Sequence, residues 1–186
     1  MSTRLLLISD THVPARAREL PAQVWRAVDD ADVVVHAGDW VDVATLDALD
    51  GRATRLVGVS GNNDGAGLRA RLGEFARFEL EALRFGVVHE TGPATGRELR
   101  MDAAYAGLDS GDAAGDDADG DPGRPAIDVL VFGHSHIPWG TTTPRGIRLL
   151  NPGSPTDRRR QPVCTVMTAV ADAGVLRDVS LLPVER

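Results

Sequence analysis

The sequence predicts an α/β fold, a four-layer αββα sandwich in which two mixed β-sheets pack face to face and helices flank them. Through the first half, apolar runs of strand length alternate with helical patterns, as in parallel strands joined by crossover helices. The second half holds a hairpin pattern and a β-rich tail. With 186 residues, 42% of them hydrophobic, the chain can build one substantial core, so we expect a single domain over residues 1–186.

The first half contains three predicted strands and two predicted helices. Each strand is a short apolar run that opens onto polar residues: Arg4–Ser9, Asp32–His36 and Thr54–Val59. Pro21–Ala31 is a predicted helix with large apolar residues on one face and a proline in its first turn. Val43–Leu49 is a second, shorter helix.

The second half changes to mostly extended segments. Phe75–Leu80 and Leu83–His89 flank Glu81-Ala82 and predict a hairpin. Arg97–Tyr105 fits a helix. The remaining predicted strands and β-rich segments are Ile127–Phe132, Thr141–Leu150, Val163–Asp172 and Val175–Leu182.

Gly107–Pro125 interrupts this pattern with six Asp among mostly Gly, Ala and Pro. Such a segment buries too little apolar surface to offset its chain entropy, so we expect the acidic insertion 107–125 to be disordered. A solvated linker explains its acidity better than a dedicated metal site does. It also lacks the spacing of an EF-hand loop, which excludes that kind of calcium sensor.

Composition narrows the functional classes. The net charge of −7 argues against a general nucleic-acid-binding surface, although a small nucleotide stays open as a substrate. The single cysteine, Cys164, has no internal disulfide partner and lies in an apolar run typical of a core. The apolar run Leu5–Ile8 is too short for a signal peptide or a membrane span, and no longer run follows. We therefore expect a cytoplasmic protein without a membrane partner.

Four of the five histidines lie in short polar blocks, most of which directly follow a predicted strand. Together with nearby Asp and Asn residues, the blocks supply seven candidate metal ligands: Asp10, His12, Asp39, Asn62, His89, His134 and His136. Parallel strands bring their carboxyl ends to one edge of a sheet. Residues two apart in an extended chain point the same way, so Asp10 with His12, and His134 with His136, should face one cleft. Mixed imidazole and carboxylate ligands suit manganese, iron and zinc, and one shared carboxylate lets the set hold two ions.

The ordered motifs Asp-x-His, Gly-Asp-x-x-Asp, Gly-Asn-x-Asp, His and Gly-His-x-His resemble the calcineurin-like metallophosphoesterase signature. Asn151-Pro152-Gly153-Ser154 resembles a turn of the small single-domain prokaryotic phosphodiesterases in that superfamily. The resemblance covers nearly the whole chain except Gly107–Pro125. Each motif alone is weak, but five in order, in the context of predicted strands, form a specific pattern.

The resemblance implies a dinuclear metal-dependent phosphodiesterase acting on a small phosphoester, in which a metal-bound hydroxide attacks phosphorus in line. By the family pattern, Asp39 bridges the two ions. Asp10, His12 and His136 hold the first ion, and Asn62, His89 and His134 hold the second. Manganese is the expected metal, with iron, zinc, nickel or magnesium as alternatives. A non-catalytic interaction scaffold of the same fold and a phosphomonoesterase stay open as alternatives, and so does a homodimer.

Two positions depart from the family pattern. Asn63 stands where many relatives carry a histidine that protonates the leaving group, and an amide is no useful acid. We therefore expect a preference for good leaving groups, such as nitrophenyl diesters or cyclic nucleotides. Glu90 replaces the glycine that usually follows the lone histidine. Its side chain could crowd the site, add a ligand or point to solvent, and we favour solvent.

Further site residues follow from their places beside these motifs. Asn63 and Asp64 are candidate catalytic residues, and Asn63 and Arg159 are candidate substrate contacts. Asp64 could equally form the turn or orient a ligand histidine. The triple arginine Arg158–Arg160 is more typical of a charged surface turn than of a phosphate grip.

Four neighbouring residues have structural interpretations. We expect His36 in the core or behind the ligands, and Asp42 as the cap of the helix that follows it. Trp40 and Trp139 lie next to metal motifs, where they either wall the cleft or pack beneath it.

Overall fold

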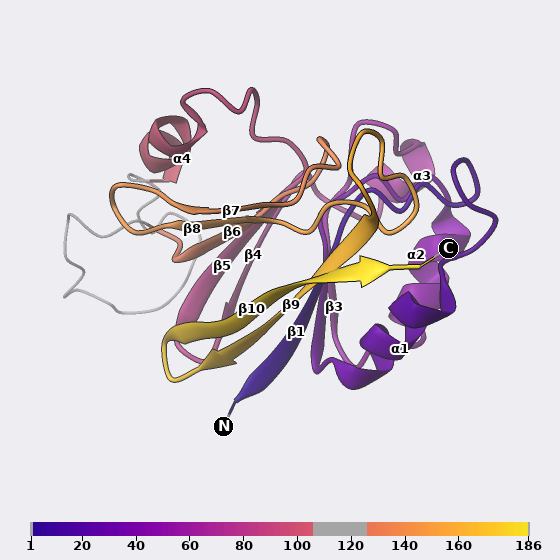
Figure 1. The fold of residues 1–186 in the computed structure, drawn as a ribbon, viewed down its shortest axis with the longest axis horizontal. Helices are drawn as coiled ribbons and strands as arrows, with labels where there is room; N and C mark the ends of the chain where they lie inside the picture. Colours follow the sequence, from indigo (N-terminus) through magenta and orange to yellow (C-terminus); the bar gives the residue numbers. More distant parts are fainter. Residues whose placement is uncertain (1, 106–125, 186) are drawn as a thin grey trace.

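Two five-stranded β-sheets face one another in the computed structural model, which describes residues 2–105 and 126–185 (Figure 1). The predicted disordered insertion Gly107–Pro125 lies outside the described residues. The first sheet has the order β10-β9-β1-β2-β3. Its strands are β1 (Thr3–Ile8), β2 (Val33–His36), β3 (Leu56–Gly58), β9 (Cys164–Asp172) and β10 (Val175–Val184). Strands β1, β2 and β3 are parallel, whereas β9 and β10 complete the sheet as an antiparallel pair.

The second sheet is also mixed and has the order β4-β5-β6-β8-β7. Its strands are β4 (Phe75–Leu80), β5 (Leu83–Val88), β6 (Val129–Val131), β7 (Trp139–Thr142) and β8 (Arg148–Asn151). Strands β5, β6 and β8 are parallel, and β4 and β7 pair antiparallel at the two edges. The predicted hairpin is the β4–β5 pair, and Thr141–Leu150 divides into two strands around a turn.

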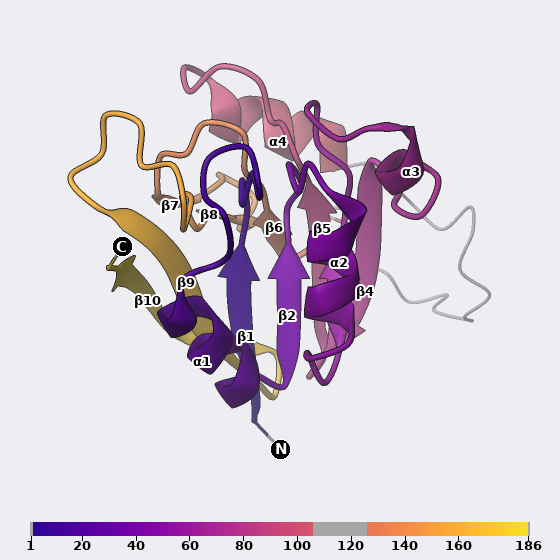
Figure 2. The ribbon, with the colours of Figure 1, turned by 90° about the vertical axis from the view of Figure 1, so that its right-hand side faces the viewer.

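Helices cover the outer faces of both sheets (Figures 1 and 2). The described helices are α1 (Ala22–Asp30), α2 (Val43–Asp50), α3 (Ala66–Arg69) and α4 (Arg97–Tyr105). The side chain of Asp42 accepts a hydrogen bond from the backbone amide of Ala44, which confirms its role as the cap of α2. The sequence did not predict α3, because one turn is too short to show a helical period. None of the helices in the described ranges has the length and apolar character that a membrane crossing needs.

Three apolar layers separate the sheets and helices, and the strands contribute to two layers at once. In β1, Leu5 and Leu7 join the core between the sheets, while Leu6 and Ile8 pack against α1 and α2. In β6, Leu130 faces the layer that also contains residues of α4. Strands buried on both faces appear in the sequence as continuous apolar runs without alternation. The predicted four-layer sandwich is confirmed.

The fold brings the carboxyl ends of several strands to one edge of the molecule. In Figure 2, the arrows of β1 and β2 point upward, and the loops that follow them lie at the top of the view. The second sheet contributes the ends of β5 and β6 to the same edge. After β5, Nδ1 of His89 lies 2.7 Å from the carbonyl oxygen of Ala37, and after β6 the His134 amide donates to Asp10 Oδ2 at 2.9 Å. The predicted strand Thr54–Val59 shortens to Leu56–Gly58, as is common at the edge of a sheet.

Candidate metal centre

The loops at this edge turn sharply at the residues expected to bind metal. The φ angles are positive at five of them: 55° at Asp10, 43° at His12, 62° at Asp39, 68° at His134 and 59° at His136. Left-handed backbone at a residue other than glycine costs about 1–3 kcal/mol and concentrates at functional sites. From the sequence, we expected extended backbone to turn Asp10 and His12, and likewise His134 and His136, in the same direction. The backbone is not extended at these residues, so that reasoning is wrong. The pairs converge because the backbone coils tightly.

The first group of potential ligands consists of Asp10, His12 and His136, all of which are buried. Nε2 of His12 lies 3.2 Å from Nε2 of His136 and 3.9 Å from Oδ1 of Asp10. Nε2 of His136 lies 3.3 Å from the same Asp10 oxygen. The three side chains therefore present two nitrogens and one oxygen to a single point.

The second group shares Asp10 with the first and adds Asp39 and His89. Oδ2 of Asp39 is 3.3 Å from Nε2 of His89 and 3.6 Å from Nε2 of His12, so it lies between the two groups. Oδ1 of Asn62 joins the cluster 3.0 Å from Nε2 of His89 and 2.9 Å from Nδ1 of His134. All seven residues expected as ligands thus meet in one cluster.

Backbone carbonyls orient two of the histidine rings. Nδ1 of His136 lies 2.6 Å from the carbonyl oxygen of Asp157, and Nδ1 of His89 lies 2.7 Å from that of Ala37. Because a carbonyl only accepts, each Nδ1 carries a proton, and each ring turns its Nε2 towards the cluster. Burial lowers the pKa of His136 to about 4, so this ring is neutral near pH 7.

The two carboxylates of the cluster have different environments. Burial raises the pKa of Asp10 to about 7, and its Oδ1 has no hydrogen-bond partner among the described residues. Burial also raises the pKa of Asp39, but hydrogen bonds from His89 and Asn63 outweigh it and hold that pKa well below its ordinary value. An orphaned, buried carboxylate oxygen beside neutral imidazole nitrogens is costly unless a cation joins it. The donor set therefore fits a divalent metal ion.

Two glycines allow the loops to approach the carboxylates closely. A Cβ atom on Gly61 would lie 2.2 Å from Asp39 Oδ1, and one on Gly133 would lie 2.8 Å from Asp10 Oδ2. Neither distance is compatible with a carbon atom in that place. The glycines of the motifs are thus required by the space that the carboxylates occupy.

Asn63 and Asp64 both act on the loop that carries Asp39. Asp64 accepts hydrogen bonds from the backbone amides of Asp39, Val41 and Gly61, at 3.2, 2.7 and 2.7 Å. Its carboxylate therefore ties two loops together and does not orient a histidine. Asn63 donates to Asp39 twice, through its backbone amide at 2.8 Å and through Nδ2 at 2.7 Å.

The remaining residues of interest lie around or beneath the cluster. His36 and Trp40 are fully buried and stacked with ring centroids 3.5 Å apart, so both lie under the site. The Glu90 side chain is 56% exposed and lies 3.9 Å from His134 Nε2, so it faces mostly solvent, as we favoured. Arg159 is exposed, and its backbone amide bonds to Asp157. Trp139 lines a cavity beside His134.

The sequence drew attention to Asn151–Ser154, but it did not predict what Ser154 contacts, and it did not point to Thr156. Ser154 Oγ donates to the Asp10 carbonyl and Thr156 Oγ1 to the Thr11 carbonyl, both at 2.7 Å. These bonds anchor the first ligand loop to the end of β8. The pairing was invisible because the partners lie about 145 residues apart. The only local signal was a pair of hydroxyl residues beside a glycine turn.

Replacing Thr156 with valine should leave the Thr11 carbonyl buried without its side-chain donor. We expect the free energy of unfolding to fall by about 1–3 kcal/mol. Urea denaturation of the wild type, Thr156→Val and Thr156→Ser would measure this loss. Serine keeps the hydroxyl and should lose less. Equal losses in both variants would show that packing, not the hydrogen bond, is the role of Thr156.

The comparison with known proteins decides the family. A family model described as the calcineurin-like phosphoesterase superfamily domain matches residues 3–174. The chain belongs to this superfamily. The chain is 32% identical to a "probable metallophosphoesterase" of Methanocaldococcus jannaschii. The alignment spans 179 residues and covers 96% of this chain and 80% of that protein.

Solved structures agree with the calcineurin-like fold. A solution structure of a Thermotoga maritima protein has a TM-score of 0.69 at 27% identity and covers 98% of this chain and 99% of that one. Vps29 of Entamoeba histolytica, solved in complex with zinc, has a TM-score of 0.71 at 21% identity, covering 97% and 98%. At that identity the likeness to Vps29 shows the fold alone. Family membership and the two ligand groups together support a metal-dependent phosphoester hydrolase.

Proposed function

We propose that this chain is a dinuclear metal-dependent phosphodiesterase. The observation that carries the proposal is that two ligand groups share Asp10, while Asp39 Oδ2 lies between His12 and His89. In this assignment Asp39 would help to hold both ions. The first ion would be held by Asp10, His12 and His136, and the second by Asn62, His89 and His134. Manganese is the metal that we would test first.

The chain's own contribution is to hold these ligands in place before any ion or substrate arrives. Two divalent ions bound there would lower the pKa of water and neutralise charge on the phosphate. The carbonyls of Asp157 and Ala37 fix the His136 and His89 rings, and Asp64 fixes the Asp39 loop. A site so constrained loses little conformational freedom on loading.

Asn63 supports a diester with a good leaving group as the substrate. It is exposed at the rim of the cluster, and its Nδ2 contacts Asp39 Oδ2 at 2.7 Å. From there the amide can donate a hydrogen bond to a substrate oxygen, but it cannot give up a proton. A leaving group that departs as a stable anion needs no such proton.

The proposal is tested by assaying the purified protein on bis-nitrophenyl phosphate and on the monoester nitrophenyl phosphate. We expect turnover of the diester to be lost on chelation and restored by added manganese. Faster turnover of the monoester would replace the proposal with a phosphomonoesterase. Bound metal without turnover of either ester would indicate a non-catalytic scaffold, and chelator-resistant turnover would refute the metal dependence.

An acid at position 63 should widen the range of leaving groups. We expect Asn63→His to raise kcat on diesters with alkyl leaving groups by about tenfold or more, because general-acid catalysis contributes at least that much. Turnover of bis-nitrophenyl phosphate should change little by comparison, since nitrophenolate leaves unaided. Parallel rate measurements on the two substrates check this. An equal change on both would show that protonation of the leaving group does not limit turnover.

A further inference from the structure

A separate cavity opens beside the metal centre, next to the amino-terminal end of α4. It has a volume of about 390 Å³, within the range of small-molecule sites. Its lining includes Glu90, Pro93, Arg97, His134, Ile137 and Trp139. Because His134 also contacts Asn62 in the metal cluster, the cavity and the cluster share a wall. A substrate held at the metals could therefore extend one substituent into the cavity.

Two buried donors on residues that line this cavity have no hydrogen-bond partner among residues 2–105 and 126–185. They are Nε of Arg97 and Nε1 of Trp139. In the described ranges, the other two buried side-chain atoms without partners are Asp10 Oδ1, which belongs to the metal cluster, and Asp102 Oδ1. Buried polar groups are almost always hydrogen-bonded, so two orphaned donors on residues that line the same cavity favour a ligand that accepts from them.

Arg97 also carries a charge that the described part of the chain does not neutralise by an ion pair. The residue is only 5% exposed, and its guanidinium carbon lies 4.9 Å from the ring centroids of both Phe132 and Trp139. Burial lowers the pKa of Arg97, as expected for a desolvated cation. Stacking on two rings would explain the packing of α4 onto the sheet. It does not explain the unpaired donors, which favour an anion.

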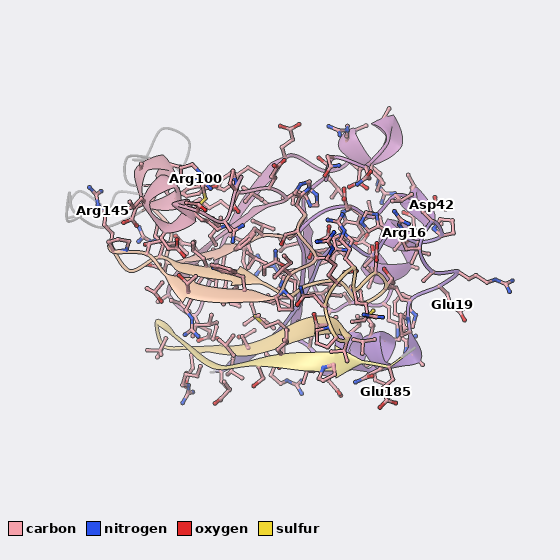
Figure 3. The ribbon with its side chains drawn as sticks, turned by 45° about the horizontal axis from the view of Figure 1, so that its top comes forward. Arg16, Glu19, Asp42, Arg100, Arg145 and Glu185 are labelled. Carbon is pink, nitrogen blue, oxygen red and sulfur yellow. The ribbon has the colours of Figure 1, made fainter. Side chains whose placement is uncertain are left out.

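The loop that forms the other wall is fixed before any ligand binds. Arg100, which follows Arg97 by one helical turn, donates from Nη2 to the Thr91 carbonyl at 2.9 Å and from Nη1 to the Thr95 carbonyl at 3.0 Å. Figure 3 labels Arg100 on this helix. Glu90 lies at the same wall, but its side chain is 56% exposed, so solvent screens its charge.

We propose that this cavity binds a second anionic group of the substrate, so that the preferred phosphodiester carries one substituent ending in a phosphate or a carboxylate. Arg97 and Trp139 donate hydrogen bonds to that group, and the apolar side chains of Pro93 and Ile137 contact the carbon skeleton that leads to it. The reaction on such a substrate rests on the phosphodiesterase function proposed above. Binding of the anionic group in the cavity does not depend on that function.

The kinetic test uses two substrates that differ only in one phosphate. Both are nitrophenyl esters of thymidine 5′-phosphate, and the second carries an additional phosphate on its 3′ oxygen. We expect wild-type kcat/KM to be about tenfold higher for the second substrate, as a charge-assisted hydrogen bond provides. Arg97→Met keeps the length of the side chain and removes its donors, and this preference should disappear.

Two further variants separate recognition from folding and from net charge. Arg145→Met removes the same charge from an exposed arginine that does not line the cavity (Figure 3) and should keep the tenfold preference. Trp139→Phe keeps an aromatic ring, removes the Nε1 donor and should reduce the preference about threefold. If Arg97→Met does not fold, as shown by its melting curve, Trp139→Phe decides. An unchanged preference in Trp139→Phe would then overturn the proposal.

Calorimetric titration tests the cavity without any turnover. Thymidine 3′,5′-bisphosphate should bind the wild type about tenfold more tightly than thymidine 5′-monophosphate, and Arg97→Met should lose this difference. If the protein hydrolyses no ester but still binds the bisphosphate more tightly than the monophosphate, the anion site is supported and the phosphodiesterase proposal fails. Equal affinities in the wild type, or an equal loss in Arg145→Met, would overturn the anion site.

Discussion

Asp39→Asn should lower kcat/KM on bis-nitrophenyl phosphate by about a thousandfold or more and should deplete metal from both positions. The carboxylate oxygen Oδ2 lies between His12 and His89, 3.6 and 3.3 Å from their Nε2 atoms. Asparagine has almost the same shape but no negative charge, so it cannot neutralise two cations at once. Steady-state kinetics and elemental analysis on the same preparation measure both effects.

Asp42→Asn is the matched control, because it makes the same chemical change three residues away. Asp42 caps α2 and forms no hydrogen bond or ion pair with a candidate ligand in the described ranges, and asparagine caps helices about as well as aspartate. We expect this control to keep the activity and metal content of the wild type. Turnover of Asp39→Asn within a few-fold of that control would contradict the bridging assignment.

Gly61→Ala should reduce kcat/KM by about a hundredfold, the scale expected when a catalytic group moves by about 1 Å. The new Cβ would lie 2.2 Å from Oδ1 of Asp39 and 2.4 Å from its backbone nitrogen. Since a backbone atom is among the neighbours, rotation of the carboxylate alone cannot relieve the clash. The Asp39 loop must therefore shift away from the cluster.

Gly65→Ala provides the control on the same loop, because no heavy atom lies within 4 Å of a Cβ built there. We expect this variant to match the wild type in kinetics and in thermal stability. Circular dichroism melting of both variants would separate a displaced ligand from a general loss of folding. Wild-type activity in Gly61→Ala would show that the loop tolerates the shift and that the positions of the ligands are less constrained than the contacts imply.

The layer arrangement could be predicted because the chain's apolar pattern is set by burial. Strands β1 and β2 are buried on both faces and appear in the sequence as continuous apolar runs. The hairpin β4–β5 could be predicted from the two-residue turn between its strands. The exact ends of β3 could not be predicted, since an edge strand has weaker apolar character. One-turn helix α3 carries no period at all.

The candidate ligands could be named from the sequence because their spacing relative to strand ends is local information. Their geometry could not, since the positive φ angles at Asp10 and Asp39 depend on contacts between loops. The contact between the Asp157 carbonyl and His136 could not be predicted from the sequence either, because every residue has a carbonyl. The cavity at Arg97 and Trp139 was missed for a similar reason: it exists only once α4 packs on the second sheet.

The central claim is that this chain holds two metal ions in one cluster bridged by Asp39. Anomalous X-ray diffraction from crystals of the manganese-loaded protein tests it most directly. The account predicts two peaks about 3.5–4 Å apart, one on each side of the Asp39 carboxylate. A single peak, or manganese bound away from Asp39, would contradict it.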